Sequence, residues 1–403
     1  MRKTAVALVA VLLVSGCTDA GSAPADAVGT RSPEAVVTQP PPVAAWRLAT
    51  LPELAGPTSG LADVVSVDAT HAWAVGSEAY DPERPNDTGT PLVLRGDGTR
   101  WVRAALPPIG WHGRFGLVAA GSPSDVWVVG TTAVASPEDQ AAHVLHYDGS
   151  AWREVPFPQG NEGFVSITGL SVAGGRAWVV GSNRVGTVVE EWDGGSWRSH
   201  RLPRECRSGG TSFGGMPNFC NVSAVKAFGP DDVWAAGNGA WKGFKGPLLF
   251  HWNGSGWRTV NVGITNEELA FDALAGRSSG ELWAVGQHGL AVRGGGGSFE
   301  VLRDAPDGLS PDVVTDPAGL PWLVENSVAP SASFAVYRAG TWIDVPAPQP
   351  PDAVGMSLNA ITATPGSTLM FAVGAADLPT TPRHLRAVLL EYAPAPSPET
   401  SRL

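Results

Sequence analysis

Apolar and polar side chains alternate in short runs along most of the chain, which is the two-residue period of a β-strand. Asp-Gly or Asn-Gly pairs stand between several of these runs, and they favour tight hairpin turns because glycine adopts positive φ at little cost. In one representative stretch the pattern predicts strands at 222–228, 232–238, 247–252 and 256–262. The chain is therefore expected to be all-β.

A repeated motif organises these strands into units. An apolar run leading into Trp-Ala-Val-Gly, or a close relative of it, recurs seven times, and its aromatic residues are Trp73, Trp127, Trp178, Trp234, Trp283, Trp322 and Phe371. The first six copies are each followed by a strand, a tight turn and a second aromatic residue, at Trp101, Trp152, Trp197, Trp257, Phe299 and Trp342. Four strands in each repeat of roughly 40–55 residues are typical of a β-propeller.

The last repeat lacks its fourth strand, and the missing strand stands at the other end of the repeat region. Residues 46–52 (WRLATLP) resemble residues 101–107 (WVRAALP), which follow the first tight turn. We expect the N-terminal strand to complete the last blade, because closing the ring removes an exposed sheet edge. The prediction is a single seven-bladed propeller with four antiparallel strands per blade. An open solenoid is the alternative, but it has no use for an isolated outer strand.

The N-terminus has the pattern of an export signal. Arg2 and Lys3 precede an apolar run at 5–14 that is too short to span a bilayer. The run leads into Val-Ser-Gly-Cys17, which resembles the lipobox of bacterial lipoproteins. The resemblance implies acylation of Cys17 and attachment to the extracytoplasmic face of the cell membrane. The alternative is an ordinary signal peptide with an incidental cysteine.

These features divide the chain into four parts. We expect a signal peptide at 1–16, a lipidated Cys17 with a disordered tether at 17–44, the propeller at 45–392 and a disordered tail at 393–403. The tether is rich in Ala, Pro, Ser, Thr and Gly, and such a composition buries too little apolar surface to fold.

The two remaining cysteines, Cys206 and Cys220, flank a Gly-rich loop. Outside the cytoplasm they are expected to form a disulfide. In the chain-entropy picture a bond closing so short a loop stabilises the fold by about 3 kcal/mol. The alternatives are two free thiols, or a metal pair that lacks further cysteines.

Strand order predicts which face of the ring binds a ligand. The turns that follow first and third strands share one face, and the longer, more variable connections share the other, where function usually lies. Fourteen of the sixteen tryptophans occupy repeat positions and are expected to pack between blades, and the other two, Trp111 and Trp241, fall in long connections. The candidate ligand-binding residues there are Tyr80, Arg84, Trp111, His112, Arg114, Trp241, Lys242 and Phe244. Alternatively, the aromatic rings only hold their own loops in place.

The repeat pattern D-V-W-A-V-G followed by H-W-D-G-x-x-W is similar to repeats of bacterial secreted propellers that are grouped with BNR/Asp-box-like or Kelch-like sequences. The resemblance implies the fold. The sialidase Asp-box S-x-D-x-G-x-x-W is matched only in its turn and its tryptophan, since YDGSAW and WDGGSW lack the leading Ser-x-Asp.

No catalytic, cofactor or metal motif stands out in the sequence, and His146 and His251 occupy equivalent repeat positions that indicate a structural role. A net charge of −11 argues against nucleic acid as a partner. We therefore expect a monomeric, non-catalytic binding module for a cell-wall glycan, a peptide or an envelope protein. The alternative is an extracellular carbohydrate hydrolase or lyase of the sialidase-like kind, which needs two carboxylates about 5–10 Å apart near the ring axis.

Overall fold

A computed structural model describes residues 45–81, 84, 89–132, 141–158, 164–183, 186–206, 219–241, 244–264, 268–306, 311–326 and 331–393. These residues form β-strands and one short 3-10 helix, η2 (Arg204–Cys206). No helix among them is long and apolar enough to cross a bilayer.

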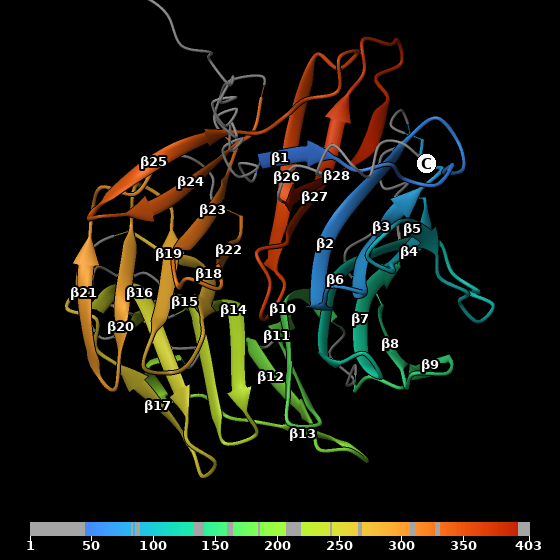
Figure 1. Ribbon diagram of the computed structural model, residues 1–403. Coiled ribbons are helices and arrows are strands. Elements are labelled where there is room, and N and C mark those ends of the chain that lie inside the picture. The colour runs from blue at the N-terminus through green and yellow to red at the C-terminus, as the bar shows by residue number, and fades with distance from the viewer. Residues whose placement is uncertain are drawn as a thin grey trace, which may run out of the picture. The chain divides into compact units, whose positions relative to one another are not determined.

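The strands form seven four-stranded antiparallel sheets, the blades (Figure 1). Blades 1 to 3 are β2 (Ser59–Asp68), β3 (His71–Glu78), β4 (Thr90–Gly96), β5 (Trp101–Arg103); β6 (Gly113–Ser122), β7 (Asp125–Thr132), β8 (Ala142–Tyr147), β9 (Trp152–Val155); and β10 (Phe164–Ala173), β11 (Arg176–Asn183), β12 (Thr187–Trp192), β13 (Trp197–Ser199). Blades 4 and 5 are β14 (Phe219–Gly229), β15 (Asp232–Trp241), β16 (Phe244–Trp252), β17 (Trp257–Val260); and β18 (Phe271–Gly276), β19 (Leu282–Gly286), β20 (Ala291–Gly295), β21 (Ser298–Leu302). Blades 6 and 7 are β22 (Val313–Thr315), β23 (Pro321–Glu325), β24 (Ser333–Arg338), β25 (Thr341–Pro346); and β26 (Gly355–Ala363), β27 (Met370–Asp377), β28 (Leu385–Ala393), β1 (Ala45–Leu48).

The blades close into a ring, as the sequence predicts. The first strand of each blade contacts the first strand of the next, and β26 of the last blade contacts β2 of the first. β1 pairs antiparallel with β28, with Trp46 opposite Tyr392 and Leu48 opposite Leu390 (Figure 1). The seven-bladed propeller with its N-terminal closing strand is therefore confirmed. β28 runs to Ala393, one residue beyond the predicted boundary.

Tryptophans fill the interfaces between blades. Trp178 on β11 is fully buried, and its ring centroid lies 5.8 Å from those of both Trp252 and Trp257 of the following blade. Phe371 of blade 7 meets Trp101 of blade 1 edge-on at 5.4 Å, so the same packing continues across the closure. Each large aromatic ring buries about 150–250 Å² of surface, which makes these contacts a major source of stability. The repeat spacing in the sequence reflects this interface.

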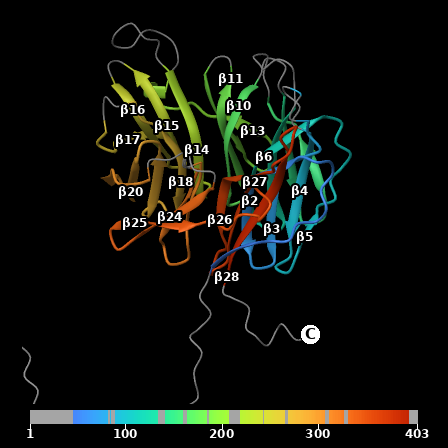
Figure 2. The ribbon, with the colours of Figure 1, turned by 90° about the horizontal axis from the view of Figure 1, so that it is seen from above.

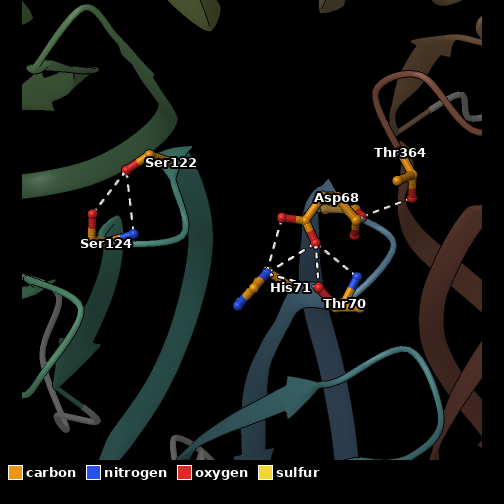
Figure 3. Close-up of polar contacts among 7 residues, drawn as sticks. Asp68, Thr70, His71, Ser122, Ser124 and Thr364 are labelled. Atoms are coloured by element: carbon orange, nitrogen blue, oxygen red, sulfur yellow. Dashed lines mark hydrogen bonds and ion pairs between the residues drawn. The ribbon is translucent and has the colours of Figure 1, made fainter.

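Short turns occupy one face of the ring, which we call the turn face. A Cβ atom on Gly98 of the β4–β5 turn would meet the carbonyl oxygen of Ala69 in the β2–β3 turn at 2.4 Å, so the two turns lie against each other. Asp68 accepts hydrogen bonds from the backbone N–H and the hydroxyl of Thr70 at 2.7 and 2.8 Å and lies 2.9 Å from His71 Nδ1 (Figure 3). The Thr70 backbone bond is the main cause that lowers the pKa of Asp68 to about 2.

The longer connections occupy the opposite face, which we call the loop face. Gly113, which begins β6, donates its N–H to the carbonyl of Gly89 in the β3–β4 connection at 2.9 Å, so connections of neighbouring blades meet there. Both ends of the propeller lie at the turn face instead. β27 begins at Met370, directly after the β26–β27 turn, and Met370 is paired with Tyr392 near the end of β28. The neighbouring residue Ala393 is paired with Ala45, so both ends lie beside this turn (Figure 2).

The disulfide is confirmed, since Cys206 in η2 is bonded to Cys220 in β14 with the two Cα atoms 4.8 Å apart. The expectation that Trp241 falls in a long connection is wrong. Residues 239–246 are not a long loop, because β15 continues to Trp241 and β16 begins at Phe244, and those two residues are opposite each other in the ladder. Local hydrophobicity underestimates strand length here because hydrogen bonding to a neighbouring strand extends the ladder past the alternating residues.

Candidate functional site

The seven inner strands leave a cavity of about 290 Å³ at the ring axis. Six of these strands carry a β-bulge at the same level, where one residue has no partner in the ladder. A bulge re-aims a side chain that the regular pleat would have placed elsewhere. The bulged residues all line the cavity, and they are Ala62, Gly116, Thr168, Ser223, Asp272 and Asn359.

Two aspartates in the cavity wall are held in the same way. Asp63 on β2 accepts the N–H of Val64 and, from β6 of the next blade, that of Val118, both at 2.8 Å. Asp312, just before β22, accepts the N–H of Val313 at 2.8 Å and that of Ile361 on β26 at 2.9 Å. Each carboxylate therefore bridges two blades in a fixed orientation and still has lone pairs available to the cavity.

Neutral polar side chains of the wall bridge other blades. Thr168 donates to the carbonyl of Val222 at 2.6 Å, and Asn359 donates to the carbonyl of Leu61 across the ring closure at 2.7 Å. These bonds satisfy buried backbone groups and connect neighbouring inner strands. Part of the polarity of the cavity thus serves the ring itself.

Lys226 on β14 contributes the positive charge of the cavity wall. Its side chain comes from an inner strand, at a position opposite Trp234 in the ladder. Within the part of the chain that the structure describes, its ammonium makes no hydrogen bond or close ion pair, and its interaction with Asp312 is a longer-range attraction. An ammonium has three donors, so Lys226 is available to a ligand.

The ionisation of these groups reflects their place in the protein interior. Burial and, to a smaller extent, the charge of Asp312 raise the pKa of Asp63 to about 8, against the opposing hydrogen bonds from the N–H groups of Val118 and Val64. Burial raises the pKa of Asp312 to about 6, opposed by its two backbone bonds and by Lys226. Burial lowers the pKa of Lys226, which the charge of Asp312 counteracts. Burial also raises the pKa of Asp272.

At pH 7 these values leave Asp63 mostly protonated and Asp312 mostly ionised. Because the folded chain keeps a proton on Asp63 that the unfolded chain releases near pH 4, this group lowers stability progressively as pH rises from about 4 to about 8. A carboxyl group with such a cost at neutral pH is a feature of functional sites more often than of structural ones.

The loop-face residues named from the sequence are brought together in part. Tyr80 is half-buried, and burial raises the pKa of its hydroxyl to about 12. The charges of Arg383, Asp377 and Arg114 also act on this hydroxyl, so charged groups of blades 7 and 2 lie within electrostatic range of Tyr80 in blade 1. Arg383 forms an ion pair with Asp377, with Nε 2.9 Å from Oδ1. We call these four residues the Tyr80 patch.

Trp111 lies in the connection before β6, as expected, and is half-buried. Its ring stacks on His143 with centroids 4.1 Å apart and meets Phe115 edge-on at 5.6 Å. These contacts hold the loop against blade 2, which is the structural alternative that the sequence left open. His112 and Arg84 are exposed.

The structure describes only the backbone of two of the remaining candidate residues and does not describe the other two. The backbone of Trp241 and Phe244 lies at the ends of β15 and β16, whereas Lys242 and Cys17 lie outside the described residues. Their proposed roles stay predictions.

His146 and His251 have the repeated structural contacts that their positions indicate. His146 stacks on Trp127 at 4.3 Å and lies 2.9 Å from Asp125, and His251 stacks on Trp234 at 4.3 Å.

Sequence reasoning missed the axial residues Asp63, Lys226 and Asp312. A signal for them exists, because each is a charged residue inside an otherwise apolar inner-strand segment, and Asp-Val-Val occurs in blades 1 and 6 at matching positions. The pattern becomes informative only when it is known that these segments face a common axis.

The chain matches no known protein-family profile and no curated protein. Among solved structures it is similar to the GH74 xyloglucanase from Xanthomonas campestris, at 14% identity and a TM-score of 0.52 over 86% of this chain and 55% of that one. It is also similar to the WD40 β-propeller domain of Doa1, at 15% identity and a TM-score of 0.52 over 89% of this chain and 99% of that one. YCF48 from Cyanidioschyzon merolae has 15% identity and a TM-score of 0.49 over 87% and 99% of the two chains. At 14–15% identity, the similarities to the xyloglucanase and to Doa1 establish the propeller fold alone.

Proposed function

We propose that this protein is a non-catalytic binding module that is anchored by a lipid on Cys17 at the extracytoplasmic face of a bacterial membrane and binds its ligand on the loop face. The observation that favours this arrangement is the separation of the two faces. Ala45, where the tether joins the propeller, lies at the turn face beside Ala393, and the longer connections lie at the opposite end of the strands.

The tether determines how the propeller meets its surroundings. On composition alone we expect the 28 residues from 17 to 44 to act as a flexible tether, for which an end-to-end distance of about 30 Å is typical. The attachment point is on the turn face, so the loop face is the side of the domain farthest from the anchored end. A propeller held in this way presents its variable connections to the cell wall and to envelope proteins.

The Tyr80 patch is the part of the loop face best suited to contact a polar ligand. It combines an aromatic ring, the exposed cation of Arg114 and the Arg383–Asp377 ion pair, contributed by three consecutive blades. Tyr and Arg are enriched among the residues that dominate binding energies, because they offer contact area together with directional hydrogen bonds. A cell-wall glycan is the ligand class that these groups fit.

Retention of the full-length protein on solubilised cell-wall glycan tests this proposal. Replacing Tyr80 and Arg114 together by alanine is expected to weaken binding at least about tenfold, which corresponds to the loss of 1–2 kcal/mol at a contact centre. The matched control replaces Thr99 and Arg100, which are exposed on the turn face, and should bind like the unaltered protein. Equal losses in both variants, with unchanged melting temperatures, would contradict a loop-face site. Absence of glycan binding by the unaltered protein would exclude this ligand class.

One observation favours a hydrolase as the second candidate. Asp63 and Asp312 face one cavity near the axis and have pKa values of about 8 and 6, and a pair of carboxyls with separated pKa values is what general acid–base catalysis requires. Both carboxyls are also occupied as bridges between blades. Turnover of a soluble wall glycan that disappears in the variant Asp63→Asn would establish the hydrolase; we expect no turnover.

A further inference from the structure

We propose that the axial cavity is a separate binding site for a small zwitterionic ligand of the amino-acid class, whose ammonium group pairs with Asp63 and Asp312 and whose carboxylate pairs with Lys226. The cavity of about 290 Å³ has room for a molecule of this size. It lies on the ring axis, apart from the Tyr80 patch, so the inference does not depend on the loop-face proposal.

The site is built before any ligand arrives. Asp63 and Asp312 each accept two backbone N–H groups, one of them from the next blade, so neither carboxylate can turn without breaking a bridge between inner strands. Thr168 and Asn359 are likewise fixed by bonds to neighbouring blades. The acceptor side chains are therefore already held in one conformation before a ligand binds, which lowers the entropic cost of binding.

The charges of the cavity are incomplete. Asp63, Asp272 and Asp312 bring up to three negative charges and Lys226 brings one positive charge, so the carboxyl groups lack a cation partner whenever Asp63 ionises. Lys226 at the same time has no close anion within the described residues. A ligand that carries one positive and one negative charge serves both groups, since its ammonium supplies a cation to Asp63 and Asp312 and its carboxylate supplies an anion to Lys226.

A divalent metal ion fits these groups less well. The ammonium of Lys226 faces the same cavity and repels a metal ion, and the part of the chain that the structure describes contains no cluster of three or more His, Cys, Asp or Glu side chains suited to hold one. A simple anion is disfavoured as well, because the carboxyl groups of Asp63, Asp272 and Asp312 line the same space.

Binding of the ammonium should be linked to the loss of a proton. Asp63 has a pKa of about 8 and ionises when a cation sits beside it, so protons leave at pH 7 and affinity rises with pH up to about 8. The other titratable groups facing the cavity are Asp312, Lys226 and Asp272, and the lining segments of β6, β10 and β26 contribute none. Asp312 and Asp272, whose pKa values burial also raises, can contribute to the released protons, and the variant Asp63→Asn isolates the part that comes from Asp63.

Calorimetric titration of the full-length protein at pH 7 tests the inference with three linear probes: 6-aminohexanoate, hexylamine and hexanoate. We expect 6-aminohexanoate to bind most tightly, hexylamine about tenfold more weakly, and hexanoate not measurably, because only 6-aminohexanoate makes charge-assisted hydrogen bonds at both ends. Repeating the titration in buffers of different ionisation enthalpy should show proton release for 6-aminohexanoate. This measurement needs no variant.

Two substitutions separate the roles of the charges. Asp63→Asn should weaken both amines at least about tenfold and remove the part of the proton release that comes from Asp63, whereas Lys226→Met should weaken 6-aminohexanoate but leave hexylamine unchanged or tighter. Asp68→Asn, at the turn face, is the matched control and should bind like the unaltered protein. If Asp63→Asn does not fold, the test rests on the unaltered protein, which should release protons when it binds 6-aminohexanoate. No binding of 6-aminohexanoate, tighter binding of hexanoate, or calcium binding with the same proton release would overturn the inference.

Discussion

Alanine in place of Trp46 is expected to lower the free energy of unfolding by about 3–5 kcal/mol, the range for truncating a large buried aromatic side chain. Trp46 is 7% exposed, stacks on Phe334 with ring centroids 4.1 Å apart, and also meets Trp322 and Tyr392. It therefore joins the N-terminal strand to both of the last two blades. Urea unfolding followed by circular dichroism gives the change in free energy.

The same strand provides its own control. Leu48 lies on β1 two residues further along, but it is 40% exposed, so Leu48→Ala should change the free energy of unfolding by no more than about 0.5 kcal/mol. Removing residues 45–51 altogether should broaden the melting transition and lower its midpoint, because β28 then becomes an exposed edge and the ring opens. A shortened protein that melts as sharply and at the same temperature as the full chain would show that the ring closes without this strand.

Replacing Glu191 by glutamine is expected to lower the free energy of unfolding by about 2 kcal/mol, within the range for leaving a buried hydrogen-bonding group unsatisfied, because Arg176 remains partly exposed to water. The Glu191 side chain is fully buried on β12. It accepts a hydrogen bond from Arg176 and lies 2.7 Å from Nε2 of His200, whose side chain is itself buried between Trp178 and Trp252. The neutral glutamine side chain cannot balance the charge of Arg176. Its amide has only one oxygen, so either Arg176 or His200 loses its hydrogen-bond acceptor. Urea unfolding at pH 7 measures the effect.

An exposed Glu–His contact serves as the control, because it tests whether the loss of stability comes from burial or from the contact. Glu154 on β9 lies 3.1 Å from His143, but its side chain is 61% exposed. Water replaces a lost interaction there, so Glu154→Gln should cost less than about 0.5 kcal/mol. Similar losses in the two variants would mean that the Glu191 cluster is not stabilised through its buried charge.

Ring closure is the feature for which the sequence was most informative. The motif around Trp101 is repeated at Trp46, and the last repeat stops one strand short, so two facts far apart in the chain fit one another. The aromatic positions could be assigned to blade interfaces for the same reason, because strand period and turn residues are local properties that the neighbouring residues determine.

The loop face could be predicted only in outline. Strand order placed Tyr80 and Arg114 on one face, but their proximity to Asp377 and Arg383 depends on how blade 7 meets blade 1. Trp111 was correctly placed in a connection, yet its stacking on His143 depends on the path of that connection over the blade. Side-chain neighbours across a closed ring are not encoded by spacing along the chain.

The amino-acid sequence by itself determined the strands, their grouping into seven blades and the strand that closes the ring, because hydrophobic alternation and turn chemistry act over a few residues. Only the tertiary structure decided that Asp63, Lys226 and Asp312 face one cavity. These residues are separated by 163 and 86 positions, and they meet because the seven inner strands converge on a single axis, where burial and mutual charge shift their pKa values.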